Sequence, residues 1–404
     1  MRAQVSPSVI KGTIRAPQSK SIAIRLLFAS LLGDVRLEKL EHSHDVDAAL
    51  SAIDQVRKTI DSSDTDVGII DVGGSGTTLR MLLPILAFLG LKCTIMGDET
   101  LQKRPLTVIR SWLEANGVSM SSDHLPLAID GKISSRNVEI PGSESSQYIS
   151  GIIYGLLLSG GGKIRLLPPV RSTSYIEMTC SVLNSLGCSI YYHGLDISVQ
   201  ALMEPLKFSG EVPGDFLLSS FYAAAALITK GSVNITGLSS RNWSMGDLRI
   251  VDIVGKSGAG SYVEDDTWHV SGNGDFLSFT EDIEDSPDMA VSLAAFSAIS
   301  GGEYRILGTS LLEIKESNRI QSVSRTLEAF GIEVSTDKGM NIRNNGNWHS
   351  GIVKDWKDHR IAMLGTVLSL RSGGMIYGAE AVAKSNPRFY DDLIRLGGEI
   401  SLRS

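Results

Sequence analysis

Several residue types are scarce in this chain of 404 residues, and each scarcity excludes a class of protein. Three cysteines, an odd number, do not make a disulfide framework, so we expect Cys93, Cys180 and Cys188 to be buried, reduced thiols. No apolar run reaches the roughly 20 residues that cross a bilayer. The start, MRAQVSPSVIKG, lacks the apolar core of a signal peptide. We therefore expect a cytoplasmic protein.

An excess of positive charge is also missing. The 38 Lys and Arg residues stand against 45 Asp and Glu residues, which gives a net charge of −7. This balance disfavours nucleic acid or an anionic membrane as the main partner. It also disfavours RNA terminal-phosphate processing, which a related repeat architecture supports. We expect local basic clusters to bind a small anion instead.

A recurring pattern organises the chain. An extended segment ends in a Gly or Pro turn, a polar cluster follows, and then come an apolar Ala/Leu/Ser-rich helix and a glycine. Two of the six copies read GTIRAPQSKSIAIRLLFASLLG and NVEIPGSESSQYISGIIYGLLLSGG. Second helices that also end at glycine, such as IQSVSRTLEAFGIEV, lie between the copies and precede β-type strands. Each unit of roughly 70 residues is therefore expected to be strand, helix, strand, helix and further strands.

Six such units exceed what one hydrophobic core usually holds, which predicts an α/β protein with two domains of three repeats each. The stretch from Lys207 to Pro213 is a plausible boundary, because prolines are rare elsewhere in the chain. If the helix starts of all units point into one cleft, their polar clusters meet there. Such a cleft would bind a ligand with two or three negative charges.

Charged and hydroxyl side chains gather where the first helices of the repeats are predicted to begin. At the first of them, Lys20, Ser21 and Arg25 accompany the free N–H groups of a helix start, which makes an anion site. The glycine-rich stretch 73–78 would let the backbone approach an anion closely, although it lacks the Lys-Ser/Thr of a P-loop. Asp288 could act in chemistry or could simply cap its helix.

The order and spacing of nine motifs resemble those of the enolpyruvyl transferase family. The motifs are SKSxxxR, GxSGTTxR, GDETLQKRP, SSQYxSG, SxSYIEMT, SPDMA, KESNR, DHRIAM and AKSNP, and they span nearly the whole chain. The resemblance implies a two-domain inside-out α/β barrel of six βαβαββ repeats, in which the first strand crosses over to complete the C-terminal domain. We expect residues 15–211 to form the N-terminal domain and residues 1–14 and 212–404 the C-terminal domain, with the active site in the cleft between them.

The resemblance also implies a reaction, and it is strongest to the branch of the family that uses shikimate 3-phosphate. The enolpyruvyl group of phosphoenolpyruvate moves to the 5-hydroxyl of shikimate 3-phosphate by addition and elimination, with release of phosphate and closure of the domains. The family uses no metal and no organic cofactor. The two small molecules are the expected partners, and we expect a monomer.

Roles for individual residues follow from the same resemblance. Asp288 is expected to take the proton of the attacking hydroxyl, and Glu316 and Lys20 are alternatives for protonating the methylene carbon. The shikimate 3-phosphate side is expected to use Lys20, Ser21, Arg25, Thr77, Ser145, Ser146, Gln147, Ser172, Tyr175, Asp288 and Lys315. The phosphoenolpyruvate side is expected to use Lys20, Gly76, Arg104, Gln147, Arg319, His359, Arg360 and Lys384. Gly74 stands where many family members carry asparagine, and Leu311 stands where some members do. These two differences leave the details of ligand contacts and the sensitivity to inhibitors open.

Two other functions stay open. Enolpyruvyl transfer to UDP-N-acetylglucosamine uses the same fold, but that branch has Lys-Asn at the first motif and commonly a reactive cysteine on a loop. Here Lys20 precedes Ser21, and residues 97–104 contain no cysteine. A non-catalytic scaffold could bind a phosphorylated metabolite, but carboxylates such as Asp288 and Glu316 in a basic pocket favour an enzyme.

The sequence His42-Ser43-His44-Asp45 suggests a metal site at first sight. A helix start capped by Ser43 or Asp45 is the stronger prediction, because these residue types are typical N-caps.

Overall fold

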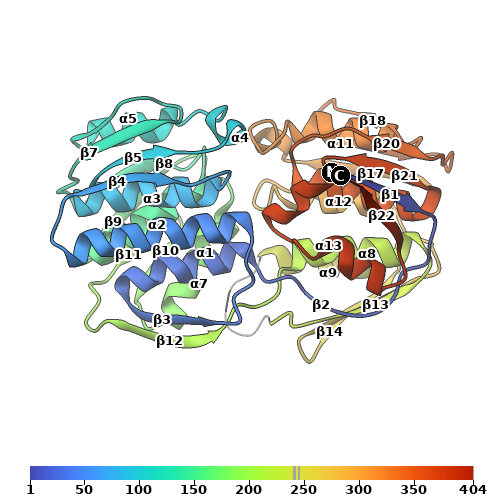
Figure 1. Ribbon diagram of the computed structural model, residues 1–404, viewed down its shortest axis with the longest axis horizontal. Coiled ribbons are helices and arrows are strands. Elements are labelled where there is room, and N and C mark those ends of the chain that lie inside the picture. The colour runs from blue at the N-terminus through green and yellow to red at the C-terminus, as the bar shows by residue number, and fades with distance from the viewer. Residues whose placement is uncertain (240–242, 244–245, 404) are drawn as a thin grey trace. The chain divides into compact units, whose positions relative to one another are not determined.

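The computed structural model describes residues 1–239, 243 and 246–403 and divides into two compact units. The N-terminal unit comprises Lys20–Val212 and Trp243, and the C-terminal unit comprises residues 1–19, 213–239 and 246–403 (Figure 1). Across the described residues, no helix is both long and apolar enough to cross a membrane.

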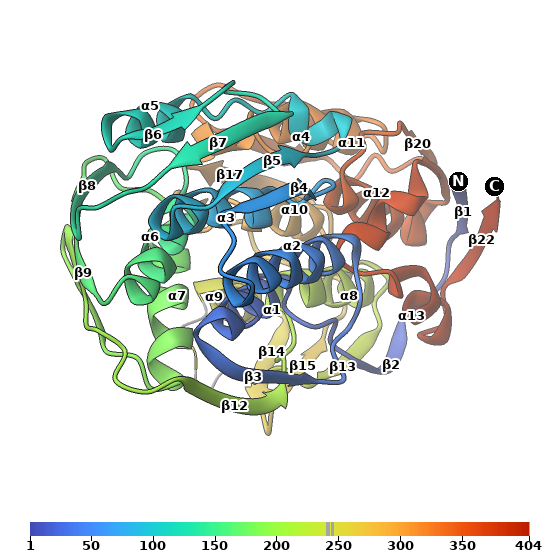
Figure 2. The same cartoon turned by 60° about the vertical axis from the view of Figure 1, so that its left-hand side comes forward.

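Three sheets belong to the N-terminal unit, and two of them share one strand order, in which a parallel pair continues into antiparallel strands. In order across the sheet, the first contains β4 (Asp66–Asp71), β5 (Lys92–Met96), β7 (Leu127–Gly131) and β6 (Val118–Met120). The second contains β8 (Asn137–Pro141), β9 (Gly162–Leu167), β11 (Asp196–Val199) and β10 (Ile190–His193). In the third, β3 (Gly33–Glu38) and β12 (Leu206–Glu211) run parallel, side by side (Figure 2).

The helices of this unit differ in how they are buried. The inner helices α1 (Lys20–Ala29), α3 (Gly76–Leu89) and α6 (Ser146–Leu158) are apolar around most of their circumference and lie in the core. Gly151 and Gly155 let α6 approach α3 closely, because a Cβ at Gly151 would lie 2.4 Å from the Met81 carbonyl oxygen. The remaining helices are η1 (Ser30–Leu32), α2 (His44–Asp61), α4 (Glu99–Gln102), α5 (Thr107–Ala115) and α7 (Thr173–Ser185).

The C-terminal unit repeats this design. One sheet contains, in order, β16 (Thr280–Asp282), β17 (Gly302–Leu307), β19 (Met340–Asn344) and β18 (Glu333–Ser335). The second contains β14 (Gly260–Glu264), β15 (Thr267–Ser271), β13 (Ser232–Thr236) and β2 (Lys11–Arg15). The third contains β20 (Gly351–Val353), β21 (Gly374–Tyr377), β1 (Arg2–Ser6) and β22 (Glu399–Arg403). The dark-blue β1 lies between β21 and the red β22, and β2 runs parallel to β13 (Figure 1). The start of the chain therefore completes two sheets of this unit, as the family resemblance implied.

The inner helices of the C-terminal unit are α8 (Phe216–Ile228), α10 (Met289–Ser297) and α12 (His359–Ser372), and all their residues except those at the very end of α12 are buried. The others are η2 (Gly246–Leu248), α9 (Arg249–Lys256), η3 (Thr309–Leu312), α11 (Arg319–Glu328), η4 (Ala379–Lys384) and α13 (Phe389–Arg395). Burial on all sides explains why the recurring helix of the sequence is rich in Ala, Leu and Ser instead of amphipathic. The predicted inside-out α/β fold of βαβαββ repeats is confirmed.

The three cysteines are buried and form no disulfide, as predicted. Burial raises the thiol pKa of Cys93 and Cys188 to about 11 and that of Cys180 to about 12. These thiols therefore stay protonated and unreactive near neutral pH.

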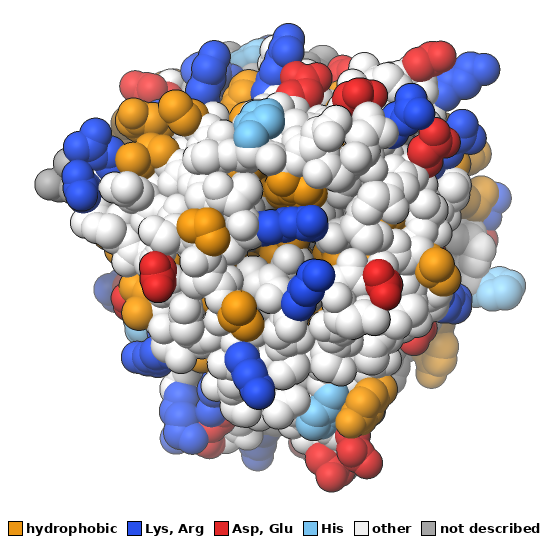
Figure 3. Space-filling model, turned by 90° about the vertical axis from the view of Figure 1, so that its right-hand side faces the viewer, with side chains coloured by type: hydrophobic (Ala, Val, Ile, Leu, Met, Phe, Trp, Pro, Cys, Tyr) orange, Lys and Arg blue, Asp and Glu red, His pale blue; other side chains and the backbone are white. Residues whose placement is uncertain are grey.

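The molecular face drawn in Figure 3 carries Lys and Arg side chains interspersed with Asp and Glu, and its hydrophobic side chains form small separate patches. This distribution agrees with the modest negative net charge of the chain. On this face, a broad basic surface of the kind that binds nucleic acid is missing.

Candidate active site

The inner helices begin where the polar motifs stand in the sequence. In the N-terminal unit, α1 begins at Lys20, α3 at Gly76 and α6 at Ser146. In the C-terminal unit, α10 follows Asp288 and α12 begins at His359. Helix N-termini present unpaired N–H groups and a partial positive charge. We call the predicted site residues 20–175 the N-terminal half-site and those of 288–384 the C-terminal half-site.

Lys20 forms an ion pair that the sequence did not indicate. Its Nζ lies 2.9 Å from Oδ2 of Asp45, whose carboxylate is almost fully buried. Asp45 lies in the first turn of α2, and Ser43 is the N-cap of that helix, accepting from the Val46 N–H. The predicted helix start is therefore confirmed, and Asp45 holds the ammonium of Lys20 instead of capping the helix.

Arg25 is 1% exposed and connects other residues of the N-terminal half-site. Its Nη1 donates to the Ser21 carbonyl oxygen at 2.8 Å, and its Nη2 donates to the Tyr175 carbonyl oxygen at 3.0 Å. Its Nε donates to the Thr179 hydroxyl at 2.8 Å. The sequence motif predicted a role for Arg25 towards a ligand carboxylate. The geometry shows that much of its guanidinium instead positions Ser21 and Tyr175.

A chain of buried hydroxyl groups extends this network to α6. The Thr179 hydroxyl lies 2.7 Å from that of Ser150, which donates to the Ser146 carbonyl oxygen at 3.0 Å. Arg25 therefore links the starts of α1 and α7 to the start of α6, although it stands 154 positions before Thr179 in the sequence. Such fully bonded buried networks fix a site rigidly.

Gln147 joins the starts of α6 and α3. Its Nε2 donates to the Thr77 hydroxyl at 2.8 Å, and its backbone N–H donates to the hydroxyl of Ser145, the N-cap of α6. Ser172 precedes α7 in a left-handed conformation, with φ of 56°, and makes no side-chain cap bond. A non-glycine residue in this region costs of order 1–3 kcal/mol, and such strain is concentrated at functional sites. The structure therefore brings together most of the predicted residues of this half-site.

Gly76 lies against two buried arginines, Arg80 and Arg104. Arg80 was missed by the sequence interpretation, although it is the arginine that ends the GxSGTTxR motif. Its guanidinium also lies over the Tyr148 ring, with 6.0 Å between Cζ and the ring centroid. Burial raises the pKa of the half-buried Glu144, although the nearby Arg80 opposes this rise. Two guanidinium groups at the N-terminus of α3 form a strong anion site.

Replacing Gly76 with alanine is expected to weaken phosphoenolpyruvate binding. The new Cβ would lie 2.7 Å from Nη1 of Arg80 and 3.2 Å from Nη1 of Arg104, so both guanidinium groups must move. A displacement of about 1 Å at a positioning residue can cost on the order of 10²-fold in rate. We expect the KM for phosphoenolpyruvate to rise by about tenfold or more, with little change in the KM for the second substrate. Equal rises in both KM values would contradict this assignment.

Arg319 is the centre of the C-terminal half-site. It is 1% exposed and donates through Nη1 to Asp288 at 2.7 Å and through Nη2 to Glu316 at 2.8 Å. Its Nε donates to Asp358 at 3.0 Å. Burial by itself would lower the guanidinium pKa, but the three carboxylates raise it overall. Arg319 therefore fixes the orientation of both predicted catalytic carboxylates.

Asp288 occupies the N-cap position of α10, as one interpretation of the sequence predicted, but its side chain makes no capping hydrogen bond. Its Oδ1 instead accepts from Arg319 and lies 3.1 Å from Nζ of Lys315. Burial would raise the pKa of this carboxyl, but Lys315, Arg319 and Arg360 together hold it well below its usual range. Asp288 is therefore ionised at every physiological pH.

The start of α12 completes the half-site. Asp358 caps this helix by accepting from the Arg360 N–H at 3.0 Å, and it also accepts from the Ser317 hydroxyl at 3.0 Å. Asp358 stands in the quoted DHRIAM motif, and the sequence placed its charge near a helix start, but its bond with Arg319 was not predicted. His359 is 1% exposed and Arg360 is 7% exposed. Among the described residues, Nη1 of Arg360 is buried and has no hydrogen-bond partner in the protein, so it can donate to an anionic ligand.

Carboxylates partly neutralise the cations of the two half-sites. Lys20, Lys315 and Arg319 are each paired with carboxylates. Lys384, the last predicted residue, lies at the end of η4. Within the described parts of the chain, no group of three or more His, Cys, Asp and Glu side chains is arranged to hold a metal ion.

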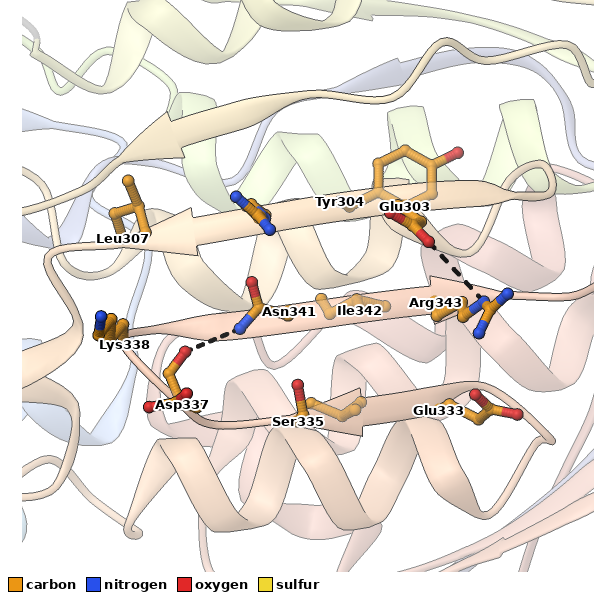
Figure 4. Close-up of a pocket in the computed structure, with 12 residues that line it drawn as sticks. Glu303, Tyr304, Leu307, Glu333, Ser335, Asp337, Lys338, Asn341, Ile342 and Arg343 are labelled. Carbon is orange, nitrogen blue, oxygen red and sulfur yellow. Dashed lines mark hydrogen bonds and ion pairs between the residues drawn. The ribbon is translucent and has the colours of Figure 1, made fainter.

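A separate hollow of about 780 Å³ lies over the sheet of β17, β19 and β18 (Figure 4). Side chains of both charges line this hollow, and Nε of Arg343 lies 3.9 Å from Oε1 of Glu303. None of the predicted site residues lines it. The hollow is therefore not part of either half-site.

The six repeats and the two half-sites define an enzyme of the enolpyruvyl transferase class. The sequence model of the family described as EPSP synthase (3-phosphoshikimate 1-carboxyvinyltransferase) matches residues 5–393. The chain belongs to this family.

Similar proteins agree with this assignment. Proteins named 3-phosphoshikimate 1-carboxyvinyltransferase from Sulfurisphaera tokodaii and Saccharolobus solfataricus are 42% and 41% identical to the chain, over the full length of both sequences. A solved structure titled as EPSP synthase from Acinetobacter baumannii has a TM-score of 0.76 at 22% identity and covers 99% of this chain and 100% of that one. That structure shows the shared fold.

Proposed function

We propose that the N-terminal and C-terminal half-sites together carry out one enolpyruvyl transfer. As a member of the EPSP synthase family, the chain moves the enolpyruvyl group of phosphoenolpyruvate to the 5-hydroxyl of shikimate 3-phosphate and releases phosphate. The observation that carries the proposal for the residues is the Arg319 cluster, in which two cations fix two carboxylates beside the unpaired Arg360 nitrogen. A pure anion-binding protein would gain nothing from those carboxylates.

The cations divide between the two substrates. Phosphoenolpyruvate brings a carboxylate and a phosphate, which suit the bidentate guanidinium groups of Arg104 and Arg360 and the ammonium of Lys384. The guanidinium group of Arg80 lies next to Gly76, as that of Arg104 does, and adds a second positive charge there. Each charge-assisted hydrogen bond to such a group is worth about 1.5–3 kcal/mol.

Shikimate 3-phosphate is assigned mainly to the N-terminal half-site. The hydroxyl groups of Ser145, Ser146 and Ser172 bind the 3-phosphate, next to the N-termini of α6 and α7. Ser21 binds the ring carboxylate at the start of α1, and Tyr175 and Gln147 lie beside the ring. Arg25 acts chiefly by positioning Ser21 and Tyr175.

The chemistry needs a base at the hydroxyl and an acid at the methylene carbon, each worth roughly 10²–10⁴ in rate. Asp288 accepts the proton of the 5-hydroxyl while the oxygen attacks C2 of phosphoenolpyruvate, and Glu316 or Lys20 gives a proton to C3. In the elimination, C3 gives a proton back to the same group and the bond from C2 to the phosphate oxygen breaks. The proton held by Asp288 then passes to the departing phosphate. Because cations strongly favour the ionised form of Asp288, this carboxylate is a weak base and accepts the proton only as the new bond forms.

Phosphate release tests the reaction directly. Purified protein is given phosphoenolpyruvate with shikimate 3-phosphate in one tube and with UDP-N-acetylglucosamine in another. We expect release in the first tube only. Release in the second tube only would keep the fold and overturn the substrate, and no release in either tube would indicate a binding scaffold.

We further propose that the two units are domains that close on shikimate 3-phosphate. Their boundaries then lie at residues 20 and 212 instead of the expected 15 and 211, because Arg15 pairs with Thr236 in a sheet of the C-terminal unit. The radius of gyration from small-angle scattering is expected to fall when shikimate 3-phosphate is added and to stay unchanged with shikimate alone. An unchanged radius with the phosphorylated compound would contradict closure. The scattering mass is expected to be that of a monomer, and fractionation of cells is expected to place the enzyme in the cytoplasm.

A further inference from the structure

Asp247 is a buried carboxyl that the proposed mechanism does not use. It lies in η2 and is 9% exposed. The Ser286 hydroxyl donates to its Oδ1 at 2.7 Å, and Ser286 is itself 4% exposed. A buried carboxyl group is costly to maintain, and such groups are frequently functional.

Ser286 begins the turn that carries Asp288. The Ser286 N–H donates to the Ile283 carbonyl oxygen at 2.9 Å, and the Met289 N–H donates to the Ser286 carbonyl oxygen at 3.0 Å. Asp288 is therefore held at two points. Its carboxylate is bound by Arg319 and Lys315, and its backbone turn is anchored through Ser286 to Asp247.

Charged groups surround Asp247 from several elements. Asp215 caps α8 and is 8% exposed, Asp288 lies before α10, and Arg360 lies in the first turn of α12. Burial, followed by the negative charge of Asp215, raises the pKa of Asp247 to about 7, and Asp288 adds to this rise. The Ser286 hydrogen bond and Arg360 lower it. On α9, the next element along the chain, Arg249 is paired with Glu281.

We propose that Asp247 is a positioning residue of the C-terminal half-site, which anchors the Asp288 turn through Ser286 and controls, by gaining or losing a proton, how strongly Arg360 attracts an anionic substrate. With its proton, Asp247 is neutral and leaves the Arg360 charge available. Without it, Asp247 adds a further negative charge next to Asp215 and Asp288, and anion binding weakens. This inference rests on the proposed role of Arg360 in binding phosphoenolpyruvate.

The test is a pH series of KM and kcat for phosphoenolpyruvate, at saturating shikimate 3-phosphate, with the full chain. For the wild type we expect KM to rise roughly tenfold from about pH 6 to about pH 8, because a charge appears close to Arg360. Asp247→Asn keeps an acceptor for Ser286 but cannot ionise, so its KM is expected to stay near the low-pH value. Asp252→Asn, an exposed position on α9, is the matched control and is expected to follow the wild type.

The titration of phosphoenolpyruvate itself is common to all variants, so only differences between them count. A KM for Asp247→Asn that rises with pH as steeply as that of the wild type would overturn the inference. A wild type without any phosphate release would overturn the proposed function and this inference with it. A wild type that turns over with a flat KM would overturn this inference alone.

If Asp247→Asn does not fold, the variant Ser286→Ala tests the same proposal. Removing the hydroxyl removes a bond that favours the ionised carboxylate, so the pH midpoint of the KM rise is expected to move upward. Loss of the anchor for the Asp288 turn is expected to lower kcat as well. A kcat loss with an unchanged midpoint would assign Ser286 a purely structural role and overturn the proposed control by Asp247.

Stability gives an independent readout of the same proton. Because the pKa of Asp247 is raised in the folded protein, the native state binds more protons than the unfolded chain between about pH 4 and pH 7. The contribution of this group to folding therefore declines as the pH rises through that window. In denaturant titrations over this pH range, the unfolding free energy of Asp247→Asn is expected to fall less than that of the wild type. An identical fall in both proteins would contradict the proposal that Asp247 binds a proton in this range.

Discussion

Replacing Arg319 with methionine is expected to abolish turnover and to destabilise the C-terminal unit. The variant leaves Asp288, Glu316 and Asp358 without their shared cation, and Asp358 is fully buried. Removing one partner of such a buried pair costs about 3–5 kcal/mol. We expect kcat/KM to fall by roughly 10³-fold or more, because the base and the alternative acid lose their orientation together.

The stability loss has a defined pH dependence. Cations hold the pKa of Asp288 below its unfolded value, so its contribution to stability is present above about pH 4 and disappears as the pH falls. The difference in unfolding free energy between the wild type and Arg319→Met is therefore expected to shrink in acid. Arg325→Met lies on the same helix, is exposed and is paired with Glu328 at 2.9 Å. This control is expected to change stability by less than about 1 kcal/mol. Equal effects of the two substitutions would contradict the central role of Arg319.

Replacing Lys20 with methionine is expected to remove at least roughly 10³ of kcat, since one side chain is lost both as a ligand for anions and as an alternative acid. The fold is expected to survive, because Lys20 lies at the start of α1 and is 17% exposed. The almost fully buried carboxylate of Asp45 would lose its ion-pair partner, so the midpoint temperature of thermal unfolding is expected to fall. Steady-state kinetics and thermal unfolding measure the two effects separately.

The double variant Lys20→Met, Asp45→Asn separates catalysis from stability. Removing the second charge is expected to restore the unfolding midpoint and to leave turnover absent. Lys58→Met, on α2 and paired with Asp54 on the surface at 2.6 Å, is the matched control and is expected to behave as the wild type. Near-normal turnover of Lys20→Met would refute the role assigned to this lysine.

The repeats were predictable from the sequence because each inner helix carries the same local signals. Glycine follows the apolar run that becomes α3, and a serine precedes both α3 and α6 as an N-cap. These signals act over a few residues and do not depend on the rest of the fold. The exchange of strands is different, since β2 pairs with β13 through hydrogen bonds between residues more than 200 positions apart. It was expected only from the family resemblance.

The sequence predicted which residues form the site, but it did not predict the ion pairs and hydrogen bonds that join them. Lys20 and Asp45 are 25 positions apart, Arg319 and Asp358 are 39 apart, and each pair forms only when two helices pack. Motif reading therefore found the cations and missed Asp45 and Asp358 as their partners. The same limit applies to Arg25, because its burial depends on the approach of α7 to α1.

The placement of residues 1–19 also determines the order in which the protein can form during synthesis. Most of the N-terminal unit has been made once Val212 has been added. The strands β1 and β2 come first but pair with β13, β21 and β22, the last of which ends at Arg403. The strand β1 can therefore pair only after β21 and β22 have been made, whereas β2 can pair as soon as β13 has been made. Lys20 follows β1 and β2 directly, so this half-site lysine lies where the chain passes from the C-terminal unit into the N-terminal unit.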